Sequence, residues 1–152
     1  MPSPALTGRV VDQANLIGPA AETAMVAKLA ALETDTSDLV FVVTVPDLNG
    51  ETIEAAGLRL GSNFGRGPND FDNWVLMLVA PKERKARIEV GEGLEGLIPS
   101  AFAAQIIQLM LPQFKAQKCE DGLVLGVAEI SKRLRSDRRR PQRLEQSEKA
   151  AG

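Results

Sequence analysis

The chain has 152 residues, of which 44% are hydrophobic and 25% are charged, as is typical of one globular domain with a buried core. Its formal net charge is −2 and its arginines crowd toward the C-terminus, which argues against nucleic-acid binding. It contains no His and one Cys, which excludes imidazole-dependent hydrolysis, His-ligated zinc and an intramolecular disulfide. Carboxylates are left to carry any acid–base or metal chemistry.

The N-terminal part is predicted to form one helix after a short ordered segment. Residues 6–16 favour a lead-in segment more than a full strand, because their β-branched run is limited to Val10 and Val11. Apolar residues at spacings of three and four predict a helix over residues 19–32, and Pro19 suits its first turn.

Two buried strands follow, separated by a helix and a loop. The continuous β-branched run of residues 39–45 is typical of a central strand covered on both faces. Residues 51–63 show a helical pattern, and residues 65–73 are rich in Gly, Pro, Asp and Asn, which predicts a loop. Residues 74–80 predict the second buried strand.

The C-terminal part is predicted to form a hairpin and two further helices. The charged residues 82–85 lead into a strand at residues 86–90, which indicates a β-hairpin with the strand before them. Apolar spacing predicts a helix over residues 99–114, interrupted near Pro112, and a last helix over residues 121–134.

These elements predict one domain over residues 6–134. The succession of helices and strands predicts an α/β fold, a three-layer α/β/α sandwich around a mixed sheet. Residues 1–5 are expected to be a disordered N-terminus. Residues 135–152 lose apolar side chains and gain like charges, which predicts a charged, disordered tail.

Carboxylate and amide side chains gather in three places where predicted strands begin or end. Because α/β sheets usually build their sites at strand ends, we expect the three places to meet at one edge of the sheet. Oxygen ligands on Gly-rich loops suit Ca²⁺, which accepts about six to eight oxygens at irregular geometry, better than Mg²⁺. The candidates are Asp12 with Asn15, then Asp70, Asp72 and Asn73, and finally Glu92 and Glu95.

Each place also has a structural interpretation that the sequence leaves open. Asp12 can stabilise a turn, and Asp70 and Asp72 can be turn residues that bond their own backbone. Glu92 and Glu95 can be solvated, or can lie at the start of a helix whose dipole favours negative charge there.

Residues 91–96 match the GxGxxG pattern of dinucleotide-binding loops. Two Glu side chains inside that loop would repel a pyrophosphate, and Pro99 interrupts the start of the next helix. The sequence therefore argues against a nucleotide ligand.

Four sequence blocks, taken in order, resemble the TPM domain. That domain is shared by a thylakoid-lumen photosystem II repair protein, a nematode receptor-associated membrane protein and many bacterial envelope proteins. The resemblance covers about residues 6–134. The blocks are GRVVDQANLI at 8–17, LVFVVTVP at 39–46, DN at 72–73 before VLMLVAP, and RIEVGEGLEG at 87–96.

The resemblance implies an α/β/α sandwich around a four-stranded sheet, with an acidic cleft that holds Ca²⁺. The family commonly has Gly where this chain has Trp74, a change expected to narrow the cleft. An aromatic residue often stands at the position of Glu92. By matching position, the residues carried over as metal candidates are Asp12, Asp72, Asn73, Glu92 and Glu95.

Two functions follow from the resemblance. In the first, the chain is a binding, assembly or repair module of the envelope, whose calcium-loaded loops bind a protein partner in or near the membrane. In the second, it is a metal-dependent acid phosphatase for phosphomonoesters, in which Asp72 positions or deprotonates water. The cleft loops offer chiefly Arg66 and Arg87 to hold a phosphoryl group, which favours the first function.

The sequence also bears on location and assembly. No stretch approaches the roughly 20 apolar residues that span a bilayer, and the N-terminus lacks the pattern of an export signal. Family members usually carry such a signal. The expected location is the periplasm or cell envelope if a signal peptide has been removed from this chain, and the cytoplasm otherwise. The chain is expected to be a monomer.

Overall fold

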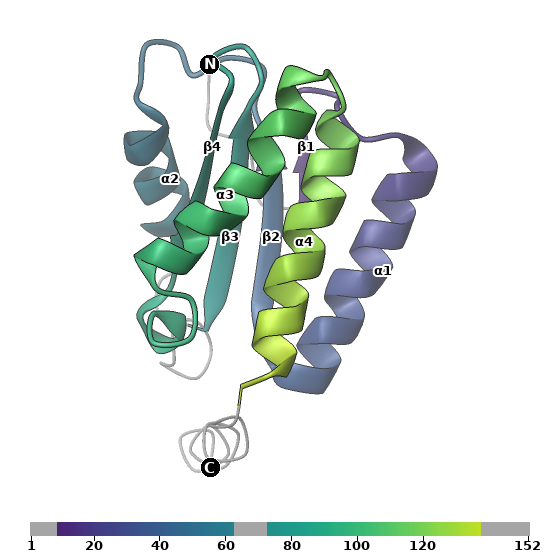
Figure 1. Ribbon diagram of the computed structural model, residues 1–152, viewed down its shortest axis with the longest axis vertical. Helices are drawn as coiled ribbons and strands as arrows, with labels where there is room; N and C mark the ends of the chain where they lie inside the picture. Colours follow the sequence, from purple (N-terminus) through teal and green to yellow (C-terminus); the bar gives the residue numbers. More distant parts are fainter. Residues whose placement is uncertain (1–8, 63–72, 138–152) are drawn as a thin grey trace.

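The computed structural model describes residues 9–62 and 73–137. Four strands form one sheet: β1 (Val10–Asp12), β2 (Leu39–Thr44), β3 (Trp74–Ala80) and β4 (Lys85–Val90). The helices are α1 (Pro19–Thr36), α2 (Ile53–Ser62), α3 (Ser100–Lys115) and α4 (Cys119–Arg135), with a short 3₁₀ helix, η1 (Glu92–Leu94), after β4. The sheet order is β1-β2-β3-β4, parallel except for the antiparallel β3–β4 hairpin (Figure 1).

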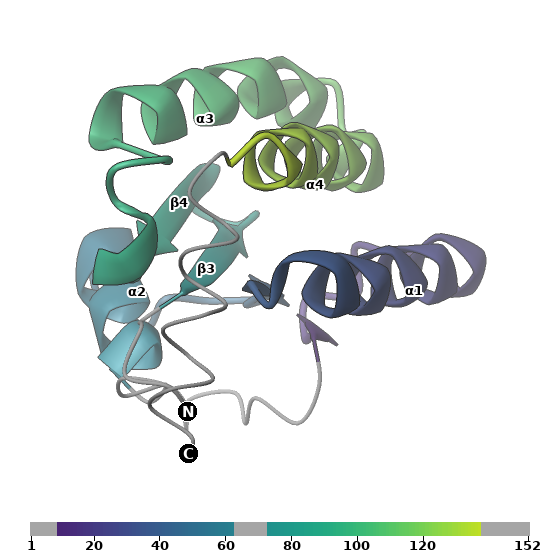
Figure 2. The same cartoon turned by 90° about the horizontal axis from the view of Figure 1, so that it is seen from below.

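Helices cover both faces of this mixed sheet, so the predicted three-layer α/β/α sandwich is confirmed. Figure 2 shows α1, α3 and α4 on one side of the strands and α2 on the other. Each side has its own hydrophobic core. The larger core joins the sheet to α1, α3 and α4, and the smaller core joins it to α2.

Strand β3 lies between the two cores. From Val75 to Ala80 no side chain is more than 1% exposed. Because side chains alternate along a strand, Val75, Met77 and Val79 enter the larger core, while Leu76, Leu78 and Ala80 enter the smaller one. This explains why the strand reads as an unbroken apolar run in the sequence.

The connections β1–α1–β2 and β2–α2–β3 step across the sheet in the same direction but on opposite faces. They therefore have opposite hands, and one departs from the right-handed rule that about 98% of such units follow. In Figure 1, α1 runs downward at the right while the strand order continues to the left. Because α1 lies on the same side of the sheet as α3 and α4, which are in front in that view, β1–α1–β2 is the left-handed connection. As a result, α1 packs beside α4.

Two details differ from the sequence prediction. The supposed lead-in segment contains a true strand, because residues 10–12 pair in parallel with residues 42–44 of β2. Helix α3 is not interrupted near Pro112 and continues to Lys115. The helix gains from continuing, since Phe114 packs against the larger core and the N–H of Ala116 bonds to the carbonyl of Pro112.

The chain ends and one loop lie largely outside the described residues. Both predicted disordered ends are affected: residues 1–5 lie outside, and of the 135–152 tail only residues 135–137 are described. Of the predicted loop at 65–73, only Asn73 is described. Among the described helices, none is long and apolar enough to cross a membrane.

The double burial of β3 gives the first prediction. Leu78→Ala should lower the free energy of unfolding by about 2–5 kcal/mol, because Leu78 is 0% exposed and its removal leaves a cavity. Leu58→Ala is the matched control, since Leu58 is 67% exposed and its loss should change that free energy by no more than about 0.5 kcal/mol. Urea unfolding followed by circular dichroism measures both. Equal losses in the two variants would contradict the assignment of β3 as the core strand.

Candidate functional site

One edge of the sheet brings together segments that are far apart in the sequence. The N–H of Leu39, at the start of β2, donates to the carbonyl of Asn73 at 3.0 Å. The N–H of Gly91, just after β4, donates to the carbonyl of Trp74 at 2.9 Å. The starts of β2 and β3 and the end of β4 therefore lie side by side. We call this the acidic edge and define it by Asp38, Asn73 and residues 91–96.

The side chain of Asn73 is fixed at this edge by two hydrogen bonds. Its amide Nδ2 donates to the backbone carbonyl of Ser37 and, at 3.3 Å, to Oδ1 of Asp38. Asn73 is 9% exposed and Asp38 is 0% exposed. Burying an ionised carboxylate raises the free energy of the folded state unless hydrogen-bond donors hold it. The hydrogen bond from Asn73 therefore helps to offset the cost of burying Asp38.

Asp38 is the residue that the sequence analysis missed. The chain places an Asp directly before β2, as it places Asp72 and Asn73 directly before β3. Because β2 and β3 are parallel, residues that precede them lie at the same edge of the sheet. Both strands are apolar or β-branched runs with an acidic residue shortly before them, and this repeated pattern could have identified Asp38 as a candidate from the sequence.

Glu92 and Glu95 follow β4 at the same edge, and both are exposed. They lie in and just after η1, whose turn is closed by the N–H of Leu94 bonding to the carbonyl of Gly91. Glu95 also borders a groove of about 470 Å³ between β4 and the start of α3. Neither carboxylate forms an ion pair with a described cation.

Asp12 lies at the other edge of the sheet. It pairs with Thr44 of β2, and Thr44 pairs with Val79 of β3. Asn73 precedes Val79 by six positions, which is about 20 Å along the strand. The expectation that all the candidates meet at one edge is therefore wrong for Asp12.

The carboxylate of Asp12 holds the loop between β1 and α1. Its Oδ1 accepts hydrogen bonds from Leu16 N–H at 2.9 Å and from the Thr44 hydroxyl at 2.6 Å, and its Oδ2 accepts one from Ile17 N–H at 2.8 Å. Asn15, in the same loop, has a left-handed backbone with φ of 56°. The turn interpretation of Asp12 thus has a direct geometric basis, and its role as a metal ligand stays a prediction.

The described residues provide only part of a metal site. Within residues 9–62 and 73–137, no three carboxylate or thiol side chains are grouped closely enough to hold an ion. Asp72, which precedes the fixed Asn73 in the chain, lies outside the described residues, as does Asp70. Asn73, Glu92 and Glu95 share the acidic edge, and their role as ligands stays a prediction.

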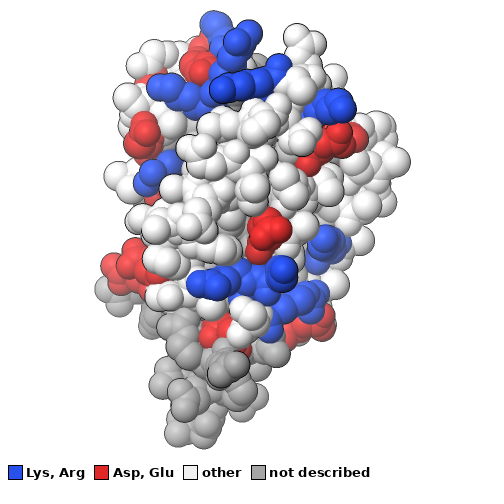
Figure 3. Space-filling model, in the orientation of Figure 1, with Lys and Arg blue, Asp and Glu red and all other residues white. Residues whose placement is uncertain are grey.

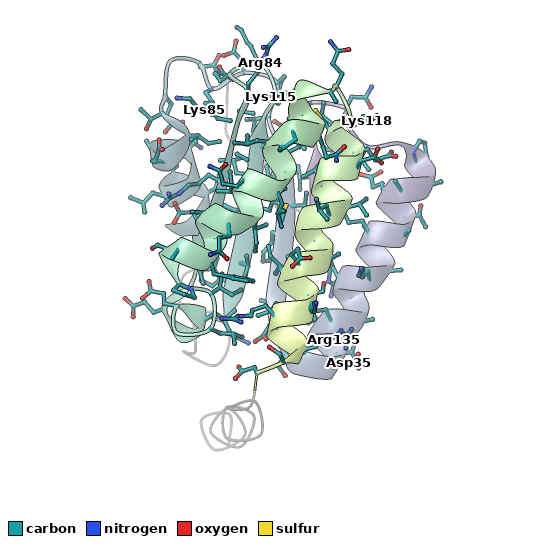
Figure 4. The ribbon with its side chains drawn as sticks, viewed as in Figure 1. Asp35, Arg84, Lys85, Lys115, Lys118 and Arg135 are labelled. Atoms are coloured by element: carbon teal, nitrogen blue, oxygen red, sulfur yellow. The ribbon has the colours of Figure 1, made fainter. Side chains whose placement is uncertain are left out.

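Three of the described arginines near the acidic edge pair with carboxylates, whereas Arg133 donates to the carbonyl of Leu97 at 2.9 Å. Arg135 pairs with Asp35 at 2.7 Å, at the lower end of the molecule in Figure 4. Arg9 pairs with Glu33 at 2.7 Å. Arg87, on β4, pairs with its neighbour Glu89 at 2.8 Å. The partners of these three arginines are Asp35, Glu33 and Glu89, and neither Glu92 nor Glu95 is among them.

The fold and this edge define a small, mixed-sheet α/β domain with acidic loops at one end of its strands. Residues 10–133 match the TPM domain, and the chain belongs to the TPM domain family. No curated protein matches the sequence.

Solved structures of other proteins share this fold. The solution structure of the N-terminal domain of a protein from P. gingivalis is 30% identical, with a TM-score of 0.77 over 84% of this chain and 82% of that one. The N-terminal domain of a Corynebacterium glutamicum protein shares the fold at 19% identity, with a TM-score of 0.64 over 90% and 84% of the two chains. A protein from the psychrophilic bacterium Bizionia argentinensis does so at 20% identity, with a TM-score of 0.66 over 78% and 81%.

The contacts of Asp12 give the second prediction. Asp12→Ala should lower the free energy of unfolding by about 1–3 kcal/mol, because two loop N–H groups and the Thr44 hydroxyl lose their acceptor. Urea unfolding should show the same loss with excess calcium and with a chelator. A loss seen only when calcium is present would instead make Asp12 a metal ligand.

Proposed function

We propose that this chain is an envelope-associated binding module, in which calcium at the acidic edge prepares a surface for a protein partner in or near the membrane. The alignment of Asp38, Asn73 and residues 91–96 along one sheet edge is the observation that supports it. The partner would be part of a membrane complex that the module helps to assemble or repair, as the family resemblance implies.

The chemistry of the edge suits a hard cation with flexible coordination. We assign the ligands to Asp72, Asn73, Glu92 and Glu95, with the buried carboxylate of Asp38 as an addition. Carboxylate, amide and backbone oxygens are the donors that Ca²⁺ accepts, and the segment 91–96 supplies three glycines that let its backbone approach an ion. Asp12 is left out because it lies at the other edge.

A binding role is favoured over phosphoryl transfer by the state of the nearby cations. A phosphoryl group in transfer needs positive groups aimed at its oxygens. Among the described arginines at this end of the molecule, Arg9, Arg87 and Arg135 each pair with a carboxylate. Arg133 is held by the carbonyl of Leu97 and by the ring of Phe102. Using any of these arginines for a phosphoryl group would break an existing contact. Calcium binding needs no such rearrangement, because Glu92 and Glu95 form no ion pair with a described cation.

The third prediction tests the calcium site. Titration with Ca²⁺ should shift the amide NMR signals of residues near Asp38, Asn73 and 91–96, and leave those near Asp12 unchanged. Glu95→Gln should weaken calcium binding by roughly an order of magnitude, because the site loses one charged ligand. Glu54→Gln, an exposed carboxylate on α2, is the matched control and should not change the affinity. Shifts centred on the loop of Asp12, or no shifts at saturating calcium, would defeat the proposal.

The fourth prediction separates the module from the phosphatase. A phosphatase-free preparation should release no phosphate from a phosphomonoester above the blank, with or without calcium. Under the enzyme hypothesis it would release phosphate in a metal-dependent reaction that Asp72→Asn abolishes while the circular dichroism spectrum stays the same. That second result would refute the binding-module hypothesis and support the phosphatase hypothesis.

A further inference from the structure

The edge of the sheet opposite the acidic edge carries a cavity of about 640 Å³. Val79 and Ala80, at the end of β3, form part of its lining, with the β3–β4 turn on one side and the α3–α4 turn on the other. The end of a parallel strand is a common place for a ligand site in an α/β sheet. The volume lies within the range of about 300–1,000 Å³ that small-molecule sites occupy.

Four cationic side chains line this cavity. Arg84 and Lys85 come from the β3–β4 hairpin, and Lys115 and Lys118 come from the turn between α3 and α4. Figure 4 shows all four at the same end of the molecule, and Figure 3 shows Lys and Arg gathered over that end. We call these four residues and the cavity between them the basic pocket.

Backbone hydrogen bonds hold both turns in place. In the hairpin, the N–H of Arg84 donates to the carbonyl of Pro81 at 3.1 Å, with Arg84 in the left-handed region at φ 57°. In the helical turn, the N–H of Lys118 donates to the carbonyl of Gln113 at 2.7 Å. Gln117 has a φ of 60°. The cations therefore project from defined backbone positions on two sides of the cavity.

None of the four cations forms an ion pair with a described carboxylate. Lys82, on the same hairpin, differs, because it pairs with Asp47 at 2.6 Å and does not line the cavity. This hydrogen-bonded pair raises the pKa of Lys82 and lowers that of Asp47. The basic pocket thus holds cations that have no described acidic partner.

Two carboxylates also line the pocket and limit its charge. Glu120 is turned toward α1, where its Oε1 accepts a hydrogen bond from Gly18 N–H at 2.8 Å. Asp121 is exposed in the first turn of α4. Among the described lining residues, four cations against two carboxylates leave a net charge of +2 around the cavity.

From this arrangement we propose that the basic pocket binds a phosphoryl group, carried either by a small soluble molecule or by an anionic lipid headgroup. Cations that approach from two sides can share the oxygens of one multivalent anion, which a single exposed lysine cannot do. The site is about 20 Å from the acidic edge along the strands and does not depend on calcium.

The fifth prediction uses pyrophosphate as the probe, with the whole chain and no divalent cation present. At low ionic strength, pyrophosphate should shift the amide NMR signals of residues 81–85 and 115–121 and leave the acidic edge unchanged. Because both turns contribute, the double variants Arg84→Gln/Lys85→Gln and Lys115→Gln/Lys118→Gln should each weaken binding roughly five- to tenfold. Affinity should also fall as salt is added.

A matched control separates a site from simple charge attraction. Lys28→Gln/Lys132→Gln removes the same two charges from exposed positions on α1 and α4 outside the pocket, and should change the affinity less than about twofold. Circular dichroism confirms that all variants fold. Equal weakening in the control and test variants, or no binding of pyrophosphate at all, would overturn the proposal.

The single Cys of the chain offers an independent readout. Cys119 lines the basic pocket, and burial raises the pKa of its thiol. Saturating pyrophosphate should slow alkylation of Cys119 by a neutral maleimide several-fold, because the anion blocks access and disfavours the thiolate. An unchanged alkylation rate at saturating pyrophosphate would place the anion elsewhere and overturn the assignment.

Vesicles identify the source of the phosphoryl group. If a lipid headgroup is the ligand, the chain should float with phosphatidylglycerol vesicles, pyrophosphate should compete, and both double variants should lose the interaction. Pyrophosphate binding without vesicle binding would assign a soluble phosphorylated molecule. Because these experiments omit calcium, their failure would not affect the proposal of a calcium site at the acidic edge. Failure of the calcium titration would likewise not affect the proposal for the basic pocket.

Discussion

The burial of β3 on both faces is the constraint on which the structure depends. Its side chains enter two separate cores, and its backbone pairs with β2 on one side and β4 on the other. Because the first pairing is parallel and the second antiparallel, the start of β3 meets the start of β2 and the end of β4. Asp38, Asn73 and residues 91–96 share one edge for this reason. The other end of β3 leads into the hairpin that carries Arg84 and Lys85.

The sequence predicted elements well where one residue type dominated a whole segment. The run of residues 74–80 predicted β3 with its observed bounds, because complete burial selects apolar side chains at every position. It failed for β1, whose three residues become a strand only by pairing with β2, a contact far away in sequence. It also failed at Pro112, where a local cost of roughly 3 kcal/mol for Pro within a helix is outweighed by tertiary packing.

The candidate site was predicted only in part, and the reason lies in strand direction. Residues that precede a parallel strand and residues that follow it lie at opposite edges. Asp12 follows β1 whereas Asn73 precedes β3. Once residues 6–16 are treated as a lead-in without direction, nothing in the sequence distinguishes the two edges. The basic pocket was missed for a different reason, because its four cations come from two turns that meet only in the folded chain.

The four-residue turn of the β3–β4 hairpin has a consequence for how the chain folds. Among the described strand pairs, β3–β4 alone can form its hydrogen bonds without first closing a long loop, because a helix separates β1 from β2 and another separates β2 from β3. We expect the hairpin to form early, before either parallel pair of strands.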